Sequence, residues 1–435
     1  MSGTSSLRVA LPAQITPGVS GGIAQFTMSL VRSLGKLNDG PEEYIVVVES
    51  REPLDWLKSF AGPNQRFLVR DRSTDSLTRR LMKRAVKPLR PAATALLNHF
   101  IGWRMWPEVP ISDGFYESLG CDVIHFPFEN FVLCAIPTVT NIHDLQHLHY
   151  PQFFKAEGLA WREVSYPAAC QASHTVVVGS QWAKDDLVRH YGVHPDKVQV
   201  VPEAPPTEFH AEPSPGDVAK VKQKYQLEQP FALYPAVTWP HKNHLRMLEV
   251  LAQLRDSRGL TVRLVCTGSP YPSFWPKIQA RVNELKLGSQ VQFLGFVPDL
   301  ELRAIYRLSQ FLVLPTLFEA SSLPIYEAWS EGVPVASANV TALPDQAMGA
   351  ALLFDPHSTA SMAEAIVRMA TDETLREELR QRGRRRLEDF DSERTAKAYR
   401  AVYRRAARAP LTEEDCELLS WDWMKHPRRK LEVKL

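Results

Sequence analysis

Residues 311–335 of this chain read FLVLPTLFEASSLPIYEAWSEGVPV. The apolar run Phe311 to Leu314 predicts a short buried strand. Pro324 suits the first turn of a helix, where its missing N–H costs no hydrogen bond. Gly332, followed by Pro334, predicts that this helix ends before a second strand begins. The stretch is therefore expected to fold as a strand, a loop and a helix.

Two carboxylates lie eight residues apart in this stretch. Glu319 precedes the predicted helix, and Glu327 lies on its second turn. The small residues Ser321 and Ser322 allow a ligand to approach the free backbone N–H groups at the helix start, where the helix dipole favours an anion. A diphosphate fits this position, and a carboxylate one turn deeper can accept hydrogen bonds from sugar hydroxyls.

The stretch resembles the donor-site signature of the retaining GT-B glycosyltransferases of glycosyltransferase family 4, in which two glutamates eight residues apart flank a Gly-rich turn and an LP dipeptide. Further motifs follow that family's carboxyl-terminal domain in order and spacing: Gly295-Phe296-Val297, Leu343-Pro344-Asp345 and Phe354-Asp355-Pro356. The resemblance covers roughly residues 140 to 395 well. It implies an α/β protein of two Rossmann-like domains that face each other across a cleft.

The resemblance also implies roles for individual residues. Ser321, Ser322, Leu323 and Glu327 would bind the nucleotide-sugar donor, with the Glu327 carboxylate on the ribose. Glu319 would contact the transferred sugar.

Length and composition agree with a large globular enzyme. A chain of 435 residues exceeds what one hydrophobic core supports, so two domains are expected. A hydrophobic content of 44% excludes a disordered chain, and a net charge of +2 gives no general argument for nucleic acid as a partner. The five cysteines are widely spaced and form no CxxC pair, which predicts small buried residues in a reducing compartment and neither disulfides nor structural zinc.

Short apolar runs alternate with helical patterns along both halves of the chain, which predicts parallel sheets covered by helices. Strands are expected at 7–11, 44–48, 123–126, 138–142, 175–178 and 198–201, and again at 231–234, 262–267, 291–296, 311–314, 333–337 and 352–354. Pro and Gly residues at 202–216 predict a linker. We therefore expect an acceptor-side domain over 1–204, a nucleotide-sugar domain over 217–395 and a helical segment over 396–435 that packs back on the first domain.

A glycine-rich segment, Gly18-Val19-Ser20-Gly21-Gly22, follows the first predicted strand. It lacks the G-x-G-x-x-G order of a dinucleotide-binding turn. Glycines permit close backbone approach, so Gly21 and Gly22 are candidates for binding the donor's sugar or phosphate; a tight turn without a ligand is the alternative. The family carries a similar glycine pair at its cleft.

Lys242 lies in the sequence Trp-Pro-His-Lys-Asn just after the first strand of the second half, where α/β sheets place ligands. Its ammonium can stabilise a diphosphate leaving group, which makes Lys242 a candidate for both catalysis and donor binding. Many family members carry an arginine beside this lysine. Here His241 occupies that place, and either it or an arginine elsewhere would complete the phosphate site.

His143 ends a predicted strand in the sequence Asn-Ile-His-Asp, and His147 and His149 follow it. The family has a histidine followed by aspartate here, beside the transferred sugar, so His143 is a candidate catalytic residue. A loop of solvated histidines is the plain alternative. A metal site is not expected, because no second group of ligands is evident in the sequence.

Six basic residues between Arg79 and Arg90 alternate with apolar residues, and Trp103 and Trp106 follow them. This pattern favours either an ordinary solvated helix face or docking on an anionic membrane surface. No stretch of about 18 apolar residues and no basic, apolar amino-terminal leader occurs. We expect a cytoplasmic protein, and the second of these alternatives would place it peripherally at the inner face of the membrane.

Together these patterns predict a hexosyltransferase of polysaccharide biosynthesis. It would move mannose or a similar sugar from a nucleoside diphosphate donor to a hydroxyl of a cell-envelope glycan or lipid-linked saccharide, with retention of configuration and without a cofactor. An epimerase of nucleotide sugars on the same fold is one alternative. A sugar-binding protein without catalysis is the other.

Overall fold

The computed structural model describes residues 6–13, 21–49, 57–58, 61–70, 109–128 and 131–423. Contacts group the chain into two compact units. The first contains Met1–Ile142, Phe154–Val176 and Val402–Leu411, and the second contains His143–Phe153, Val177–Ala401 and Thr412–Leu435. The domain bounds expected from the sequence stay a prediction.

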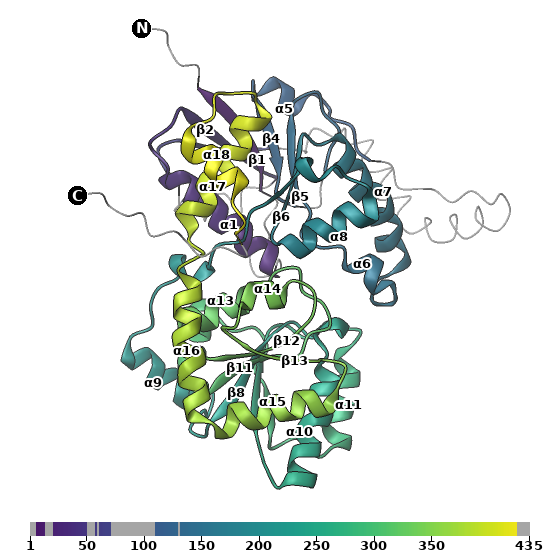
Figure 1. Cartoon of the computed structure of the whole chain (residues 1–435), viewed down its shortest axis with the longest axis vertical. Coiled ribbons are helices and arrows are strands. Elements are labelled where there is room, and N and C mark those ends of the chain that lie inside the picture. Colours follow the sequence, from purple (N-terminus) through teal and green to yellow (C-terminus); the bar gives the residue numbers. More distant parts are fainter. Residues whose placement is uncertain are drawn as a thin grey trace, which may run out of the picture. The chain divides into compact units, whose positions relative to one another are not determined.

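The first sheet has seven strands in the order β3-β2-β1-β4-β5-β6-β7. Their bounds are β1 (Leu7–Pro12), β2 (Glu42–Val48), β3 (Gln65–Val69), β4 (Val123–Phe126), β5 (Thr138–Asn141), β6 (Thr175–Val178) and β7 (Val198–Val200). β1 pairs in parallel with β2 and β4. Helices follow most strands: α1 (Gly21–Lys36), α5 (Phe115–Ser118), α6 (Gln146–His149), α7 (Ala156–Ala172) and α8 (Gln181–Tyr191) (Figure 1).

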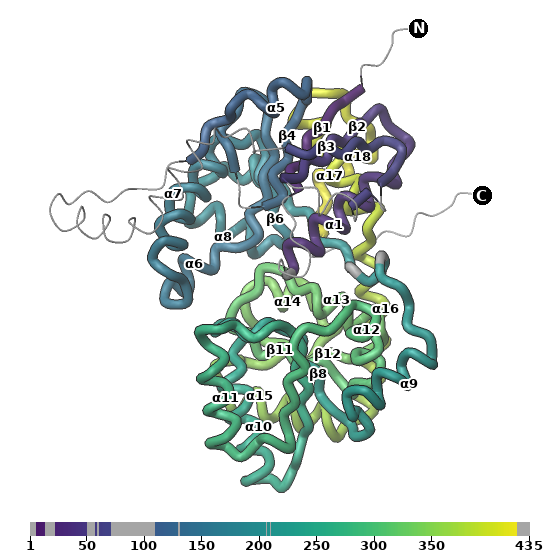
Figure 2. The backbone as a smooth tube through the Cα atoms, turned by 180° about the vertical axis from the view of Figure 1, so that it is seen from behind, coloured from purple at the N-terminus to yellow at the C-terminus, as the bar shows by residue number. Residues whose placement is uncertain are grey.

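The second sheet has six strands in the order β10-β9-β8-β11-β12-β13, and all its pairings are parallel. Its strands are β8 (Phe231–Pro235), β9 (Arg263–Thr267), β10 (Val291–Phe293), β11 (Phe311–Leu314), β12 (Val335–Ala338) and β13 (Leu352–Phe354). Figure 2 shows β8, β11 and β12 together in the middle of this unit. The order places β8 and β11 next to each other, so the loops that follow them meet at one edge.

Helices surround the second sheet. They are α9 (Pro215–Lys224), α10 (His244–Arg258), α11 (Trp275–Glu284), α12 (Asp299–Leu308), α13 (Leu323–Ser330), α14 (Leu343–Ala347), α15 (Thr359–Thr371) and α16 (Glu373–Leu387). Two further helices, α17 (Ser392–Ala406) and α18 (Glu413–Ser420), follow in the chain. Short 3₁₀ turns occur at Pro151–Phe153, Pro195–Lys197, Pro206–Phe209 and Pro240–Lys242. α10 packs on α15, and α13 packs on α16. This confirms the expected α/β architecture with two Rossmann-like parallel sheets.

The last turn of α17 belongs to the first unit. The Tyr403 hydroxyl lies 2.8 Å from Nδ1 of the buried His125, and Arg404 Nε donates to Glu42 Oε1 at 2.7 Å. Both ends of the Arg404–Glu42 pair are buried, so removing one partner would leave an uncompensated charge in the core. These contacts attach the last turn of α17 to β2 and β4.

Two minor features complete the fold. Cys121, Cys170 and Cys266 are buried as expected, but Cys416 is exposed, so the expectation of buried thiols was wrong there.

Among the described helices, none has both the length and the apolar character needed to cross a bilayer.

Candidate active site

Lys242 and Glu319 form an ion pair at the carboxyl ends of β8 and β11. Lys242 Nζ donates to Glu319 Oε1, and the two side chains are 20% and 14% exposed. The buried Tyr234 hydroxyl donates to the Lys242 carbonyl at 2.5 Å. Asn243 has a φ of 62°, a left-handed conformation that asparagine tolerates, and its Nδ2 donates to the Pro315 carbonyl at 2.9 Å. The loop after β8 is therefore bound to the loop after β11.

The backbone of Glu319 is held from the loop after β12. Its N–H donates to Thr341 Oγ1 at 3.1 Å, and the Thr341 hydroxyl donates back to the Glu319 carbonyl at 2.5 Å. Glu319 thus precedes α13, as predicted, with its carboxylate directed at Lys242.

The start of α13 differs from the sequence prediction at one amide. The Ser322 N–H donates to Gln346 Oε1 at 3.0 Å, and Gln346 Nε2 donates to the Ser322 carbonyl at 2.8 Å. The expectation of a free amide at Ser322 was therefore wrong. Within the described part of the chain, the N–H groups of Ser321 and Leu323 donate no hydrogen bond. The Ser322 hydroxyl is buried and also lacks a partner among the described residues.

Residues far away in the sequence hold this loop. Ser180 caps α8 by accepting the Ala183 N–H at 3.2 Å, and its hydroxyl donates to the Ala320 carbonyl at 2.9 Å. Tyr150 donates to the Leu317 carbonyl at 3.3 Å. Ser180 is therefore an N-cap and a support of the loop at once.

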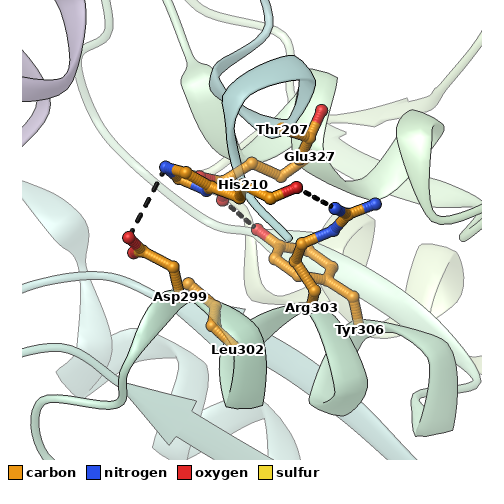
Figure 3. A pocket seen from close by; sticks show the side chains of 7 residues that line it. All are labelled: Thr207, His210, Asp299, Leu302, Arg303, Tyr306 and Glu327. Carbon is orange, nitrogen blue, oxygen red and sulfur yellow. Dashed lines mark hydrogen bonds and ion pairs between the residues drawn. The ribbon is translucent and has the colours of Figure 1, made fainter. Parts of the chain in front are cut away.

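Glu327 lies on the second turn of α13, as predicted, and borders a small pocket (Figure 3). Tyr306 of α12 donates to Glu327 Oε2 at 2.7 Å. Burial raises the pKa of the Glu327 carboxyl to about 7, and the Tyr306 hydrogen bond opposes that rise. Across the pocket, His210 Nε2 lies 3.5 Å from Asp299 Oδ2.

His241 is a poor substitute for an arginine. Burial, followed by the neighbouring Lys242 ammonium, lowers the pKa of the His241 imidazole well below its usual range. It is therefore neutral near pH 7 and can offer a hydrogen bond but no charge.

An aromatic pair that was not predicted from the sequence lies in the loops after β8 and β9. Trp239 stacks on Tyr271 with ring centroids 4.0 Å apart, and Trp239 remains 38% exposed. Gly268 allows the loop after β9 to lie close to the loop after β8. Its φ is 106°, and a Cβ there would lie 2.6 Å from the Ala236 carbonyl carbon. The Trp-Pro dipeptide after a strand was visible in the sequence, but nothing there identified Tyr271 as its partner.

His143, Gly21 and Gly22 are the remaining candidates from the sequence. His143 Nδ1 is 3.6 Å from Glu203 Oε1, and both side chains are largely buried. His147 is buried beside the Tyr191 hydroxyl at 3.1 Å, so the alternative of solvated histidines does not hold for it. Gly21 and Gly22 form the first turn of α1 instead of the loop before it. Gly18 to Ser20, Trp103, Trp106 and the basic run from Arg79 to Arg90 lie outside the described residues.

Comparison with solved structures identifies the fold as GT-B. A crystal structure of Anabaena Alr3699/HepE in complex with UDP and glucose superposes with a TM-score of 0.65 at 15% identity, over 91% of this chain and 99% of that one. The chain also matches two family models, "Glycosyltransferase Family 4" over residues 20–209 and "Glycosyl transferases group 1" over residues 217–386. It belongs to the family 4 type of GT-B glycosyltransferases and is a glycosyltransferase.

Two curated relatives are mannosyltransferases of Escherichia coli. O-antigen chain mannosyltransferase B is 27% identical over 274 residues, which cover 61% of this chain and 70% of that protein. Serotype-specific mannosyltransferase WbdA is 24% identical over 273 residues, covering 62% of this chain but only 32% of that protein.

Proposed function

We propose that this glycosyltransferase moves mannose from a nucleoside diphosphate sugar to a hydroxyl of a cell-envelope glycan, with retention of configuration. The observation that carries the proposal is the Lys242–Glu319 pair beside the unpaired amides of α13. A positive side chain, open N–H groups and a carboxylate form the set that a diphosphate and its sugar require.

The chemistry follows from the charges. An ammonium has three N–H donors, so Lys242 can keep its bond to Glu319 and give the others to phosphate oxygens. The amides of Ser321 and Leu323 and the hydroxyl of Ser322 would add neutral donors. Together they would stabilise the negative charge that develops on the leaving diphosphate, a role that does not require a metal ion.

Other residues complete the proposal. The Glu327 carboxylate would accept hydrogen bonds from the donor's ribose, Glu319 would contact the transferred sugar, and His143 would act on the same sugar. Gly21 and Gly22 would bind the donor from the start of α1.

The choice of mannose and of a glycan acceptor is supported by the two mannosyltransferase relatives. In the family that the sequence resembles, GDP-mannose and UDP-sugars are both frequent donors, and we propose GDP-mannose. The solved Anabaena protein was crystallised in complex with UDP and glucose, so a uridine donor is the main competitor. A lipid-linked acceptor would agree with docking of the basic run from Arg79 to Arg90 on an anionic membrane.

A thermal-shift screen tests the donor directly. A ligand that binds only the folded state raises the melting midpoint by mass action. We expect GDP-mannose and GDP to raise the midpoint of the full chain more than UDP-glucose and UDP, with free mannose as the control. A larger rise with the uridine compounds would reject the guanosine donor, and no rise with any nucleotide would reject the site.

A further inference from the structure

Two histidines converge on one buried aspartate where α6 meets α8. His149 is the last residue of α6, and Asp186 and His190 lie one turn apart on α8. His149 Nε2 is 3.0 and 2.9 Å from the two Asp186 carboxylate oxygens, and His190 Nε2 is 3.3 Å from Oδ1. The two helices lie side by side in Figures 1 and 2. We propose that these three residues bind a divalent transition-metal ion, with Zn²⁺ as the preferred occupant.

The geometry is close to what Zn²⁺ requires. Zn–N and Zn–O bonds of about 2.0–2.1 Å in a tetrahedron place neighbouring ligand atoms roughly 3.3 Å apart. The three ligand atoms offered by His149, Asp186 and His190 all lie within 4.8 Å of one another. Both histidine–aspartate distances already match, so only the two imidazoles would need to approach each other, by at most about 1.5 Å, through side-chain rotation.

The ligand types select the metal. Two imidazoles and one carboxylate suit Zn²⁺, whereas Mg²⁺ and Ca²⁺ prefer oxygen ligands alone. The Asp186 side chain is 3% exposed, while those of His149 and His190 are 30% and 36% exposed. The aspartate is therefore fixed within the fold, and the imidazoles leave an open side through which an ion can enter and a water can supply the fourth ligand.

The arrangement differs from an ordinary ion pair. His194 with Asp196, and His210 with Asp299, each bring one imidazole to one carboxylate. At Asp186 two imidazoles share one carboxylate, and their rings lie 5.4 Å apart, edge to face. The sequence near the histidines that follow β5 shows no second group of ligands. Asp186 and His190, four residues apart on one helix face, are that second group.

The site would act as a clamp and not as a catalytic centre. The His149 ring packs on Phe318 at 5.3 Å and on Trp182 at 5.6 Å. Phe318 precedes Glu319 in the chain. A metal at His149 would therefore stiffen the support of the loop that carries Glu319, and metal binding itself does not depend on the proposed function.

The test uses the full chain, stripped of metal with a chelator and dialysed, in a Cys416→Ser background that removes the exposed thiol. Zn²⁺ is titrated in competition with a chromophoric chelator, and Co²⁺ serves as a spectroscopic substitute. We expect one equivalent of Zn²⁺ with a Kd of about 1 μM or lower and the visible bands of four-coordinate Co²⁺.

His190→Ala should weaken Zn²⁺ binding at least tenfold and abolish the four-coordinate Co²⁺ spectrum. His194→Ala, a matched exposed histidine, should bind Zn²⁺ like the parent protein. Zn²⁺ should raise the melting midpoint of the parent and of His194→Ala but not of His190→Ala. If His190→Ala fails to fold, His149→Ala replaces it. Binding of less than one equivalent, or equal affinity in His190→Ala and the parent, would overturn the proposal.

Discussion

Lys242 and Glu319 are far apart in the sequence but form one ion pair in the candidate active site. Each is largely buried, so each depends on the other for charge compensation in the absence of a ligand. A bound diphosphate would give the ammonium a second anionic partner. Their meeting follows from the adjacency of β8 and β11 in the sheet.

Lys242→Ala should lower the turnover number by about a hundredfold or more, because the leaving diphosphate would lose its positive neighbour. Lys224→Ala provides the matched control, since Lys224 also pairs with a glutamate, Glu301, but its side chain is 54% exposed. Steady-state kinetics of both variants checks the prediction. Similar turnover in the two variants would assign the leaving-group charge to another residue.

Glu327 should make the folded state sensitive to pH. Its pKa of about 7 lies above the ordinary value of 4.5, so the folded protein binds more protons than the unfolded chain between these values. Stability should therefore fall as pH rises from 4.5 towards 7, by on the order of 3 kcal/mol, and stay lower above it.

Glu327→Gln keeps the shape and the acceptor for Tyr306 but cannot ionise. At each pH, the melting midpoint of the variant is compared with that of the natural chain. The difference, variant minus natural chain, should be larger at about pH 8 than at about pH 5. A midpoint difference that is the same at both pH values would mean that the carboxyl does not titrate in this range.

Among the elements, most strands were predicted from their apolar runs, and the misses have physical causes. β3 was not predicted; it is an edge strand that begins with the polar residues Gln65 and Arg66, and none of its residues is fully buried. β10 ends at Phe293, earlier than expected, because Gly295 turns the chain with a φ of 70°. β12 begins at Val335 because Pro334 has no N–H for the ladder.

The site residues that belong to a local sequence motif could be predicted. The contacts that join them to residues far away in the sequence could not. Lys242, Glu319 and Glu327 came from local patterns at strand ends and on one helix. The hydrogen bond from the Ser322 N–H to Gln346 could not be predicted, because Gln346 lies 24 residues away on another helix. The hydroxyl that donates to Glu327 belongs to Tyr306, which lies 21 residues away on another helix, and no local pattern joins the two residues.

Gly268 tests how closely the loops after β8 and β9 approach. Gly268→Ala adds a Cβ where φ is 106° and the Ala236 backbone is 2.6 Å away, so neither strain nor clash can be relieved cheaply. We expect a loss of about 1–3 kcal/mol, seen as a melting midpoint several degrees lower. Gly288→Ala, where a new Cβ meets no atom, is the control. Equal midpoints in the two variants would show that the loops can move apart.

For the molecule as a whole, binding to vesicles decides between the two alternatives for the basic run from Arg79 to Arg90, a solvated helix face or docking on an anionic membrane. The six basic residues between Arg79 and Arg90 each contribute about 1 kcal/mol near such a surface, and salt screens the attraction. The full chain should therefore sediment with phosphatidylserine vesicles at low salt but not with phosphatidylcholine vesicles. Replacing the six residues by glutamine should abolish sedimentation. Equal partitioning to both lipids would exclude an electrostatic surface.

The central claim is sugar transfer from a nucleoside diphosphate donor with retention of configuration. Its most direct test is to incubate the full chain with GDP-α-mannose and a mannose-terminated oligosaccharide and to determine the new linkage by NMR. We predict that the acceptor gains one mannose in an α-linkage, together with one released GDP for each bond formed. A β-linked product would contradict retention, and a donor converted to its epimer without an extended acceptor would contradict transfer itself.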